Sequence, residues 1–188
     1  MPHAFPFGAV MRLAVVTLLT FGSAAHASDD NAVESERQDA TLSDLMTGSA
    51  ERNLQSVATE CARYDRGYRP DCLRQGLALT WRNLPYHGDY GPMRTAMQQT
   101  EGAISQAVAK AADRTVPRLD SKLEANPRFK ARRFYTAVGA ASLAAVSGQM
   151  RTAFDRLQTS LDDLGAQKPG SAAHYTRIKA AIAALARI

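Results

Sequence analysis

The chain has 188 residues and a formal net charge of +5, from 23 lysine and arginine residues against 18 acidic ones. Its length suits one compact domain able to bury a core. Only two cysteines and four histidines are present, and none of them lies at the spacing of a zinc-ligand set, so we predict no metal site.

The first 27 residues have the features of a secretory signal. An apolar run from Leu13 to Phe21 follows Arg12 and precedes a small-residue A-x-A pattern that ends at Ala27. We expect cleavage after Ala27 and a periplasmic or secreted location, with Met1 or Met11 as the start. The run is about half the ~20 residues that a membrane-spanning helix needs, so we expect no transmembrane anchor in the mature protein.

Charge is unevenly distributed after this signal. Residues 28–40 (SDDNAVESERQDA) are polar, acidic and without an apolar repeat, which predicts a disordered leader. From Arg52 onward there are 21 basic and 11 acidic residues, and sixteen of the basic ones are arginine. Since arginine binds carboxylates and phosphates in a two-pronged manner, this part of the chain favours an anionic partner. The alternative is an arginine-rich surface that is simply solvated.

Residues 41–188 predict a domain of helices. Apolar residues recur there every three or four positions, and glycine or proline separates the periodic segments. We predict helices over residues 49–66, 70–84, 93–111, 127–164 and 172–185, and a short helical piece over 120–125. No segment shows the two-residue alternation of a strand. Short connections and one apolar face per helix favour an all-α, up-and-down bundle of four to five helices.

The two cysteines, Cys61 and Cys72, fall in the last turns of the first predicted helix and the first turn of the second. An even cysteine number in an exported chain predicts one disulfide, which would stabilise this fold by roughly 3 kcal/mol. A redox pair would usually show C-x-x-C spacing, and a zinc site would need two further ligands nearby. We therefore interpret the pair as a structural staple.

Two groups of basic residues are candidates for binding an anion or a protein partner. Their members are Arg66 and Arg69 in the disulfide loop, and Arg128, Lys130, Arg132 and Arg133 at the start of the predicted fourth helix. In the second group, two arginines four residues apart would share a helix face and form an anion cradle with the backbone donors of the first turn. The alternative is pairing with Asp120 and Glu124. The loop arginines have a similar alternative, packing over the bundle end with Asp65 and Asp71 as partners.

Motifs of catalysis are lacking. The sequence has no G-x-S-x-G, no glycine-rich phosphate loop and no S-x-x-K. His87 and Asp89, in the loop YHGDYGP, are the one pair suited to acid-base work, and the alternative is a polar turn. We predict no catalytic residue and no cofactor.

Together these features favour an exported, non-catalytic envelope protein whose arginine-rich surface binds an anionic or protein partner. Nucleic acid is not expected, because the chain is predicted to be exported. A second hypothesis is a bundle that binds a small apolar ligand between its helices, opposite Met93 and Met97. An enzyme that uses the His87 and Asp89 pair is the third.

Overall fold

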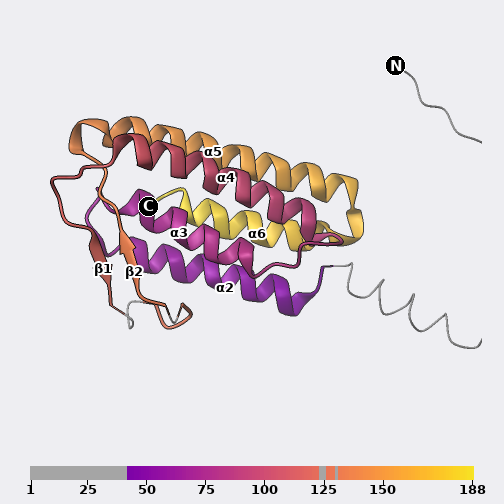
Figure 1. Cartoon of the computed structure of the whole chain (residues 1–188). Coiled ribbons are helices and arrows are strands. Elements are labelled where there is room, and N and C mark those ends of the chain that lie inside the picture. Colours follow the sequence, from indigo (N-terminus) through magenta and orange to yellow (C-terminus); the bar gives the residue numbers. More distant parts are fainter. Residues whose placement is uncertain (1–41, 123–125, 130) are drawn as a thin grey trace, which may run out of the picture.

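A computed structural model describes residues 42–122, 126–129 and 131–188. The predicted signal peptide (1–27), the predicted leader (28–40), Glu124 and Lys130 lie outside these residues. The described part is a bundle of five α-helices, so the predicted all-α, disulfide-stapled bundle is confirmed (Figure 1).

The helices follow one another up and down the bundle and close into a ring. Each packs against the next in sequence, and the last packs against both its predecessor and the first. Their bounds are α2 Asp44–Cys61, α3 Arg69–Arg82, α4 Tyr90–Ala111, α5 Ala140–Gln167 and α6 Ala172–Leu185, with a short 3₁₀ turn, η2, at Pro169–Ser171.

One apolar core runs through the middle of the ring. Every helix contributes fully buried side chains to it, among them Leu54, Leu77, Met97, Phe154 and Ile178. Burying each such side chain stabilises the fold by about 1.5–3 kcal/mol. The three-to-four-residue spacing that predicted the helices is thus the spacing of this core.

Helix α2 begins at Asp44, five residues earlier than the sequence suggests. The side chain of Ser43 accepts a hydrogen bond from the backbone N–H of Met46, which caps the first turn, and Asp44 places a carboxylate near the positive end of the helix dipole. Gly48 is buried in this turn beside Arg52 and Arg177. The cap and the tertiary contacts therefore outweigh the low helix propensity of glycine.

The predicted fourth helix begins later than expected, and a strand pair occupies its first residues. Strand β1 (Leu119–Ser121) pairs antiparallel with β2 (Arg133–Tyr135), and both lie against the lower left of the bundle in Figure 1. The predictions of a helix from Pro127 and of no strand were wrong. The predicted helical piece over 120–125 was wrong at Asp120 and Ser121, which belong to β1, and its residues 123–125 lie outside the described residues. In β2, Arg133 and Tyr135 are buried and Phe134 is exposed, which is strand periodicity over too few residues to detect.

Gly76 sets the spacing between α2 and α3. A Cβ atom at this position would overlap both methyl groups of Val57. We predict that Gly76→Ala lowers the free energy of unfolding by about 1–3 kcal/mol, because an overpacked core forces neighbours to shift. Urea unfolding followed by circular dichroism measures this.

The matched controls are Gly102→Ala and Gly148→Ala, in α4 and α5, where an added Cβ meets nothing within 4 Å. These should raise stability by about 0.5–1 kcal/mol through helix propensity. The double change Val57→Ala with Gly76→Ala should cost less than the sum of the single changes. Additive losses would contradict the steric explanation.

Candidate functional site

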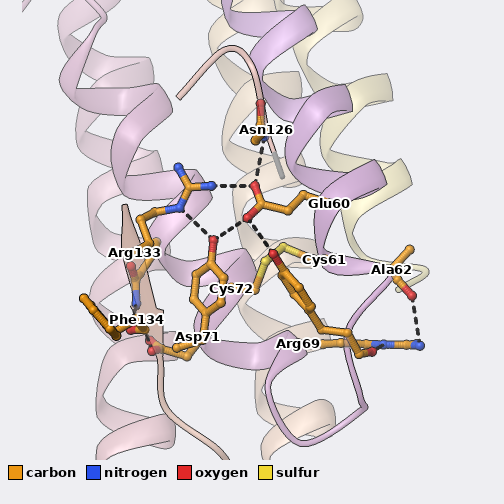
Figure 2. The surroundings of a disulfide bond; sticks show 12 residues. Glu60, Cys61, Ala62, Arg69, Asp71, Cys72, Asn126, Arg133 and Phe134 are labelled. Carbon is orange, nitrogen blue, oxygen red and sulfur yellow. Dashed lines mark hydrogen bonds and ion pairs between the residues drawn. A yellow bond between two sulfur atoms is a disulfide. The ribbon is translucent and has the colours of Figure 1, made fainter. Parts of the chain in front are cut away.

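One end of the bundle collects most of the residues that the sequence singles out. Helix α2 ends here, α3 and α5 begin here, and the strand pair lies alongside. The Cys61 to Cys72 disulfide joins the first two of these helices, with a Cα–Cα distance of 5.7 Å and both cysteines buried (Figure 2). The predicted staple is confirmed.

Arg69 closes the turn beside the disulfide. Its guanidinium donates to the main-chain oxygens of Tyr64 (2.8 Å), Ala62 (3.2 Å) and Ile188 (3.2 Å). The last carbonyls of a helix need partners outside it, and Arg69 supplies one of them. After Cys61 the main chain continues in i→i+3 turns, with N–H of Arg63 donating to Glu60 O and N–H of Tyr64 to Cys61 O, so α2 ends at Cys61 rather than near residue 66. Asp71, the partner considered from sequence, pairs with Arg74 instead.

A buried polar cluster lies on the other side of the disulfide, centred on Glu60 (Figure 2). Its carboxylate accepts hydrogen bonds from the Tyr135 hydroxyl (2.6 Å), from Nη2 of Arg133 (2.5 Å) and from Nδ2 of Asn126 (3.0 Å). The Tyr64 hydroxyl donates a further bond (3.2 Å). Two strand residues and one loop residue are thereby attached to the end of α2.

These contacts determine how the cluster titrates. Burial raises the pKa of Glu60, but the hydrogen bonds from Tyr135, Arg133 and Asn126 outweigh it and hold that pKa below its ordinary value. Burial, together with the neighbouring Glu60 charge, raises the pKa of Tyr64 to about 12. At neutral pH the cluster is a carboxylate paired with a guanidinium and two neutral phenols.

The arginines near the strand pair are largely engaged within the protein. Arg133 is buried against Glu60, Arg132 pairs with Asp120, and Nε of Arg128 donates to Oδ1 of Asn53 at 2.7 Å. Because no helix begins at Pro127, the predicted cradle of first-turn donors does not exist. The predicted alternative, pairing with Asp120, is what the structure contains.

Phe134, in β2, lies at the surface and is 42% exposed. Its ring lies near the guanidinium carbons of Arg118 and Arg132, at 5.7 Å and 5.3 Å from the ring centroid. These cation–π contacts account for the orientation of the exposed ring.

A groove at the same end brings arginines together from three separate segments. It is lined by the start of α3, the first half of α5 and the residues that end α6, and its volume is about 660 Å³. The lining arginines are Arg66, Arg69, Arg151 and Arg187. Sequence reasoning found the first two and missed the last two, because nothing in their local pattern distinguishes them from solvated helix residues.

Three of the groove arginines form no ion pair within the described residues. Arg66, Arg151 and Arg187 are exposed, and within the described ranges none of their guanidinium groups is paired with a carboxylate. The first turn of α5 also lines the groove and has neither a side-chain cap nor an acidic residue, whereas the first turn of α3 contains Asp71. Because a helix N-terminus carries partial positive charge, it adds to that of the arginines.

The groove also has an apolar part. Leu143 and Ile188 are partly buried at its wall, above the buried side chains of Leu73 and Phe154. The lining contains neither an acidic residue nor a histidine. The groove is therefore suited to a ligand that is negatively charged and carries some apolar surface.

The features that suggested an apolar ligand are separated in the fold. Met93 and Met97 are buried in the core at 1% and 0% exposure. The small residues of α5, including Gly148 and Ala153, line a second groove against α4 that neither methionine reaches. Core packing accounts for the two methionines.

His87 and Asp89 do not form a pair in the structure. The Asp89 carboxylate accepts hydrogen bonds from Nζ of Lys168 and from Oγ of Ser171 (2.9 Å), so it holds the turn before α6. The His87 ring packs edge-on against Tyr86, with 5.1 Å between centroids. The polar-turn alternative describes this arrangement.

Comparisons with known proteins give no further guide, since no known protein family, curated protein or solved structure matches this chain. Within the described residues, histidine, cysteine and acidic side chains form no group of three or more placed to hold a metal ion. In the same residues, no helix combines the length and apolar character that crossing a bilayer requires.

We predict that Glu60→Gln lowers the free energy of unfolding by about 3–5 kcal/mol. The substitution leaves the buried Arg133 charge uncompensated, and breaking a buried pair from one side is costly. Chemical denaturation measures the change. Asp120→Asn, which removes an exposed carboxylate from Arg132, is the matched control and should change stability little. Equal effects of the two substitutions would contradict the central role of Glu60.

The raised pKa of Tyr64 predicts a loss of stability in alkali. A phenol that holds its proton more tightly when folded contributes stability that is fully present below pH 10, its ordinary pKa, and is lost as pH rises to about 12. The urea midpoint of the wild type should fall over this window. The urea midpoint of the Tyr64→Phe variant should fall less steeply over the same pH window. Identical pH profiles for the two proteins would exclude Tyr64 as a source of the stability loss.

Proposed function

We propose that the protein is an exported, non-catalytic helical protein that binds an anionic partner at the arginine-rich end of its bundle. One observation carries the proposal. Four arginines from distant parts of the chain line a single groove, and three of them have no carboxylate partner in the part of the chain that the structure describes.

Electrostatics supports an anionic occupant for this groove. Like charges gathered beside the N-terminus of α5 repel one another, and that repulsion is relieved when a negative group binds between them. Arginine also binds carboxylate and phosphate oxygens through two parallel N–H donors. Arg128, Arg132 and Arg133 are bound to partners within the protein, so we place the proposed contact surface at the groove.

The disulfide supports the exported location. Structural disulfides form and persist in oxidising compartments, and the bond joins Cys61 to Cys72 within the core. The apolar run and A-x-A pattern before residue 28 support the same conclusion.

The chemistry of the groove supports binding without catalysis. Arginine keeps its proton in proteins and so cannot act as a general base. Ser147 supplies the only side-chain hydroxyl among the lining residues, with no base beside it in that lining. Glu60, whose pKa is lowered by its hydrogen-bond partners, is enclosed by them in a different place.

We predict that the wild type binds vesicles containing phosphatidylglycerol, and that Arg66→Gln, Arg151→Gln and Arg187→Gln together weaken this binding about tenfold or more. Co-sedimentation over a range of salt concentrations measures it. Binding should also weaken steeply as salt rises, because charge attraction between exposed groups is screened within about 10 Å at 0.1 M salt.

The control removes the same charge elsewhere, with Arg52, Arg114 and Arg156 changed to glutamine. These arginines are exposed and lie outside the groove. The control should bind nearly as well as the wild type. Equal losses in both triple variants would show that net charge, and not this groove, drives binding, and binding that is insensitive to salt would reject the proposal.

A further inference from the structure

We propose that the groove between α3, α5 and α6 is a site for a phosphate ester, a phosphate group carried on a small organic body. This inference rests on the proposed anion-binding function and names its ligand class. The relevant groups are the guanidiniums of Arg66, Arg69, Arg151 and Arg187 and the apolar wall beside them.

Charge favours phosphate over carboxylate. A carboxylate carries one negative charge and would leave most of the four guanidinium charges uncompensated. A phosphate monoester carries about −1.5 to −2 at pH 7 and presents three strong acceptor oxygens. Several guanidinium forks approaching from different sides match that geometry.

Internal hydrogen bonds hold the Arg69 guanidinium in one orientation before a phosphate group binds. Three of its five N–H donors are bound to the carbonyls of Tyr64, Ala62 and Ile188, which fixes the plane of the guanidinium. The remaining two donors are available to a ligand. A donor already fixed in place loses little conformational entropy on binding.

The other three arginines line the same groove as Arg69. Arg66 lies in the loop before α3, Arg151 in α5 and Arg187 after α6, so they reach the groove from three segments of the chain. Helix α5 begins beside them at Ala140, with no acidic residue in its first turn and no side-chain cap. Its first N–H groups therefore add donors to the same region.

The size of the groove indicates an ester rather than the free ion. A volume of about 660 Å³ is far more than one phosphate group fills, and Leu143 and Ile188 offer apolar surface beside the charges. An organic body such as glycerol would occupy this space. Two sources share this chemistry, a soluble phosphate ester and the headgroup of an anionic lipid.

The test uses isothermal titration calorimetry with sn-glycerol 3-phosphate, glycerol, inorganic phosphate and succinate as probes. We expect glycerol 3-phosphate to bind most tightly, inorganic phosphate and succinate to bind several-fold more weakly, and glycerol not to bind. In NMR spectra we expect glycerol 3-phosphate to shift the backbone amide signals of Arg66, Arg69 and Ala140. Succinate is the deciding probe, because it carries two negative charges without a phosphate.

The deciding variant changes Arg66, Arg151 and Arg187 to glutamine, and the control changes Arg52, Arg114 and Arg156. The first should lose about tenfold or more in affinity for glycerol 3-phosphate, and the control should retain it. Arg69 is left intact because it also supports the fold. Circular dichroism and thermal unfolding establish that both variants are folded.

Vesicles separate the two sources of the phosphate. If vesicles containing phosphatidic acid bind and glycerol 3-phosphate competes with them, the lipid headgroup enters the groove. If only the soluble ester binds, the ligand is a free phosphate ester. Either result supports the proposed site, provided that the deciding variant abolishes the binding.

Failure of this inference differs from failure of the proposed function. Succinate binding as tightly as glycerol 3-phosphate would overturn the phosphate assignment and leave an anion site in place. Binding of phosphatidylglycerol vesicles through the groove arginines, without binding of any small phosphate ester, would assign the phosphate to a lipid headgroup. Absence of binding to every anionic probe and vesicle would reject both.

Discussion

The ion pair between Glu60 and Arg133 holds together the end of the molecule where the candidate site lies. Both side chains are buried, and 73 residues of sequence separate them. Tyr135 and Asn126 complete the hydrogen bonding of the carboxylate, whereas Nη1 of the buried Arg133 guanidinium has no hydrogen-bond partner among the described residues. Since α5 starts soon after β2, this pair also fixes where the groove wall begins.

The disulfide and Arg69 complete the same assembly from the other side. The bond constrains the turn between α2 and α3, and Arg69 binds three carbonyls around that turn. The backbone N–H of Val138 donates to the Gly67 carbonyl (2.9 Å), which ties the turn to the segment before α5. The groove arginines therefore project from a rigid frame.

The sequence predicts the helices and the disulfide well, because helical spacing and cysteine placement are local signals. It does not predict the strand pair, where a charged residue, Arg133, points inward to a partner far away in sequence. Arg66 and Arg69 were found beside the cysteines, whereas Arg151 and Arg187 resemble ordinary surface residues until α5 and α6 are brought together. The sequence shows the group of basic residues near residue 130. It does not show their internal partners, since Asn53 and Glu60 belong to another helix.

Ring closure by α6 gives the bundle a particular folding order. The turn between α2 and α3 spans few residues, while contact between α6 and α2 joins opposite ends of the described chain. Bringing distant segments together costs more chain entropy, and that cost is met before the contact stabilises anything. The parts of the groove wall that come from α3 and α6 thus come together only when α6 has packed against α2. A fully formed groove therefore indicates that folding is complete.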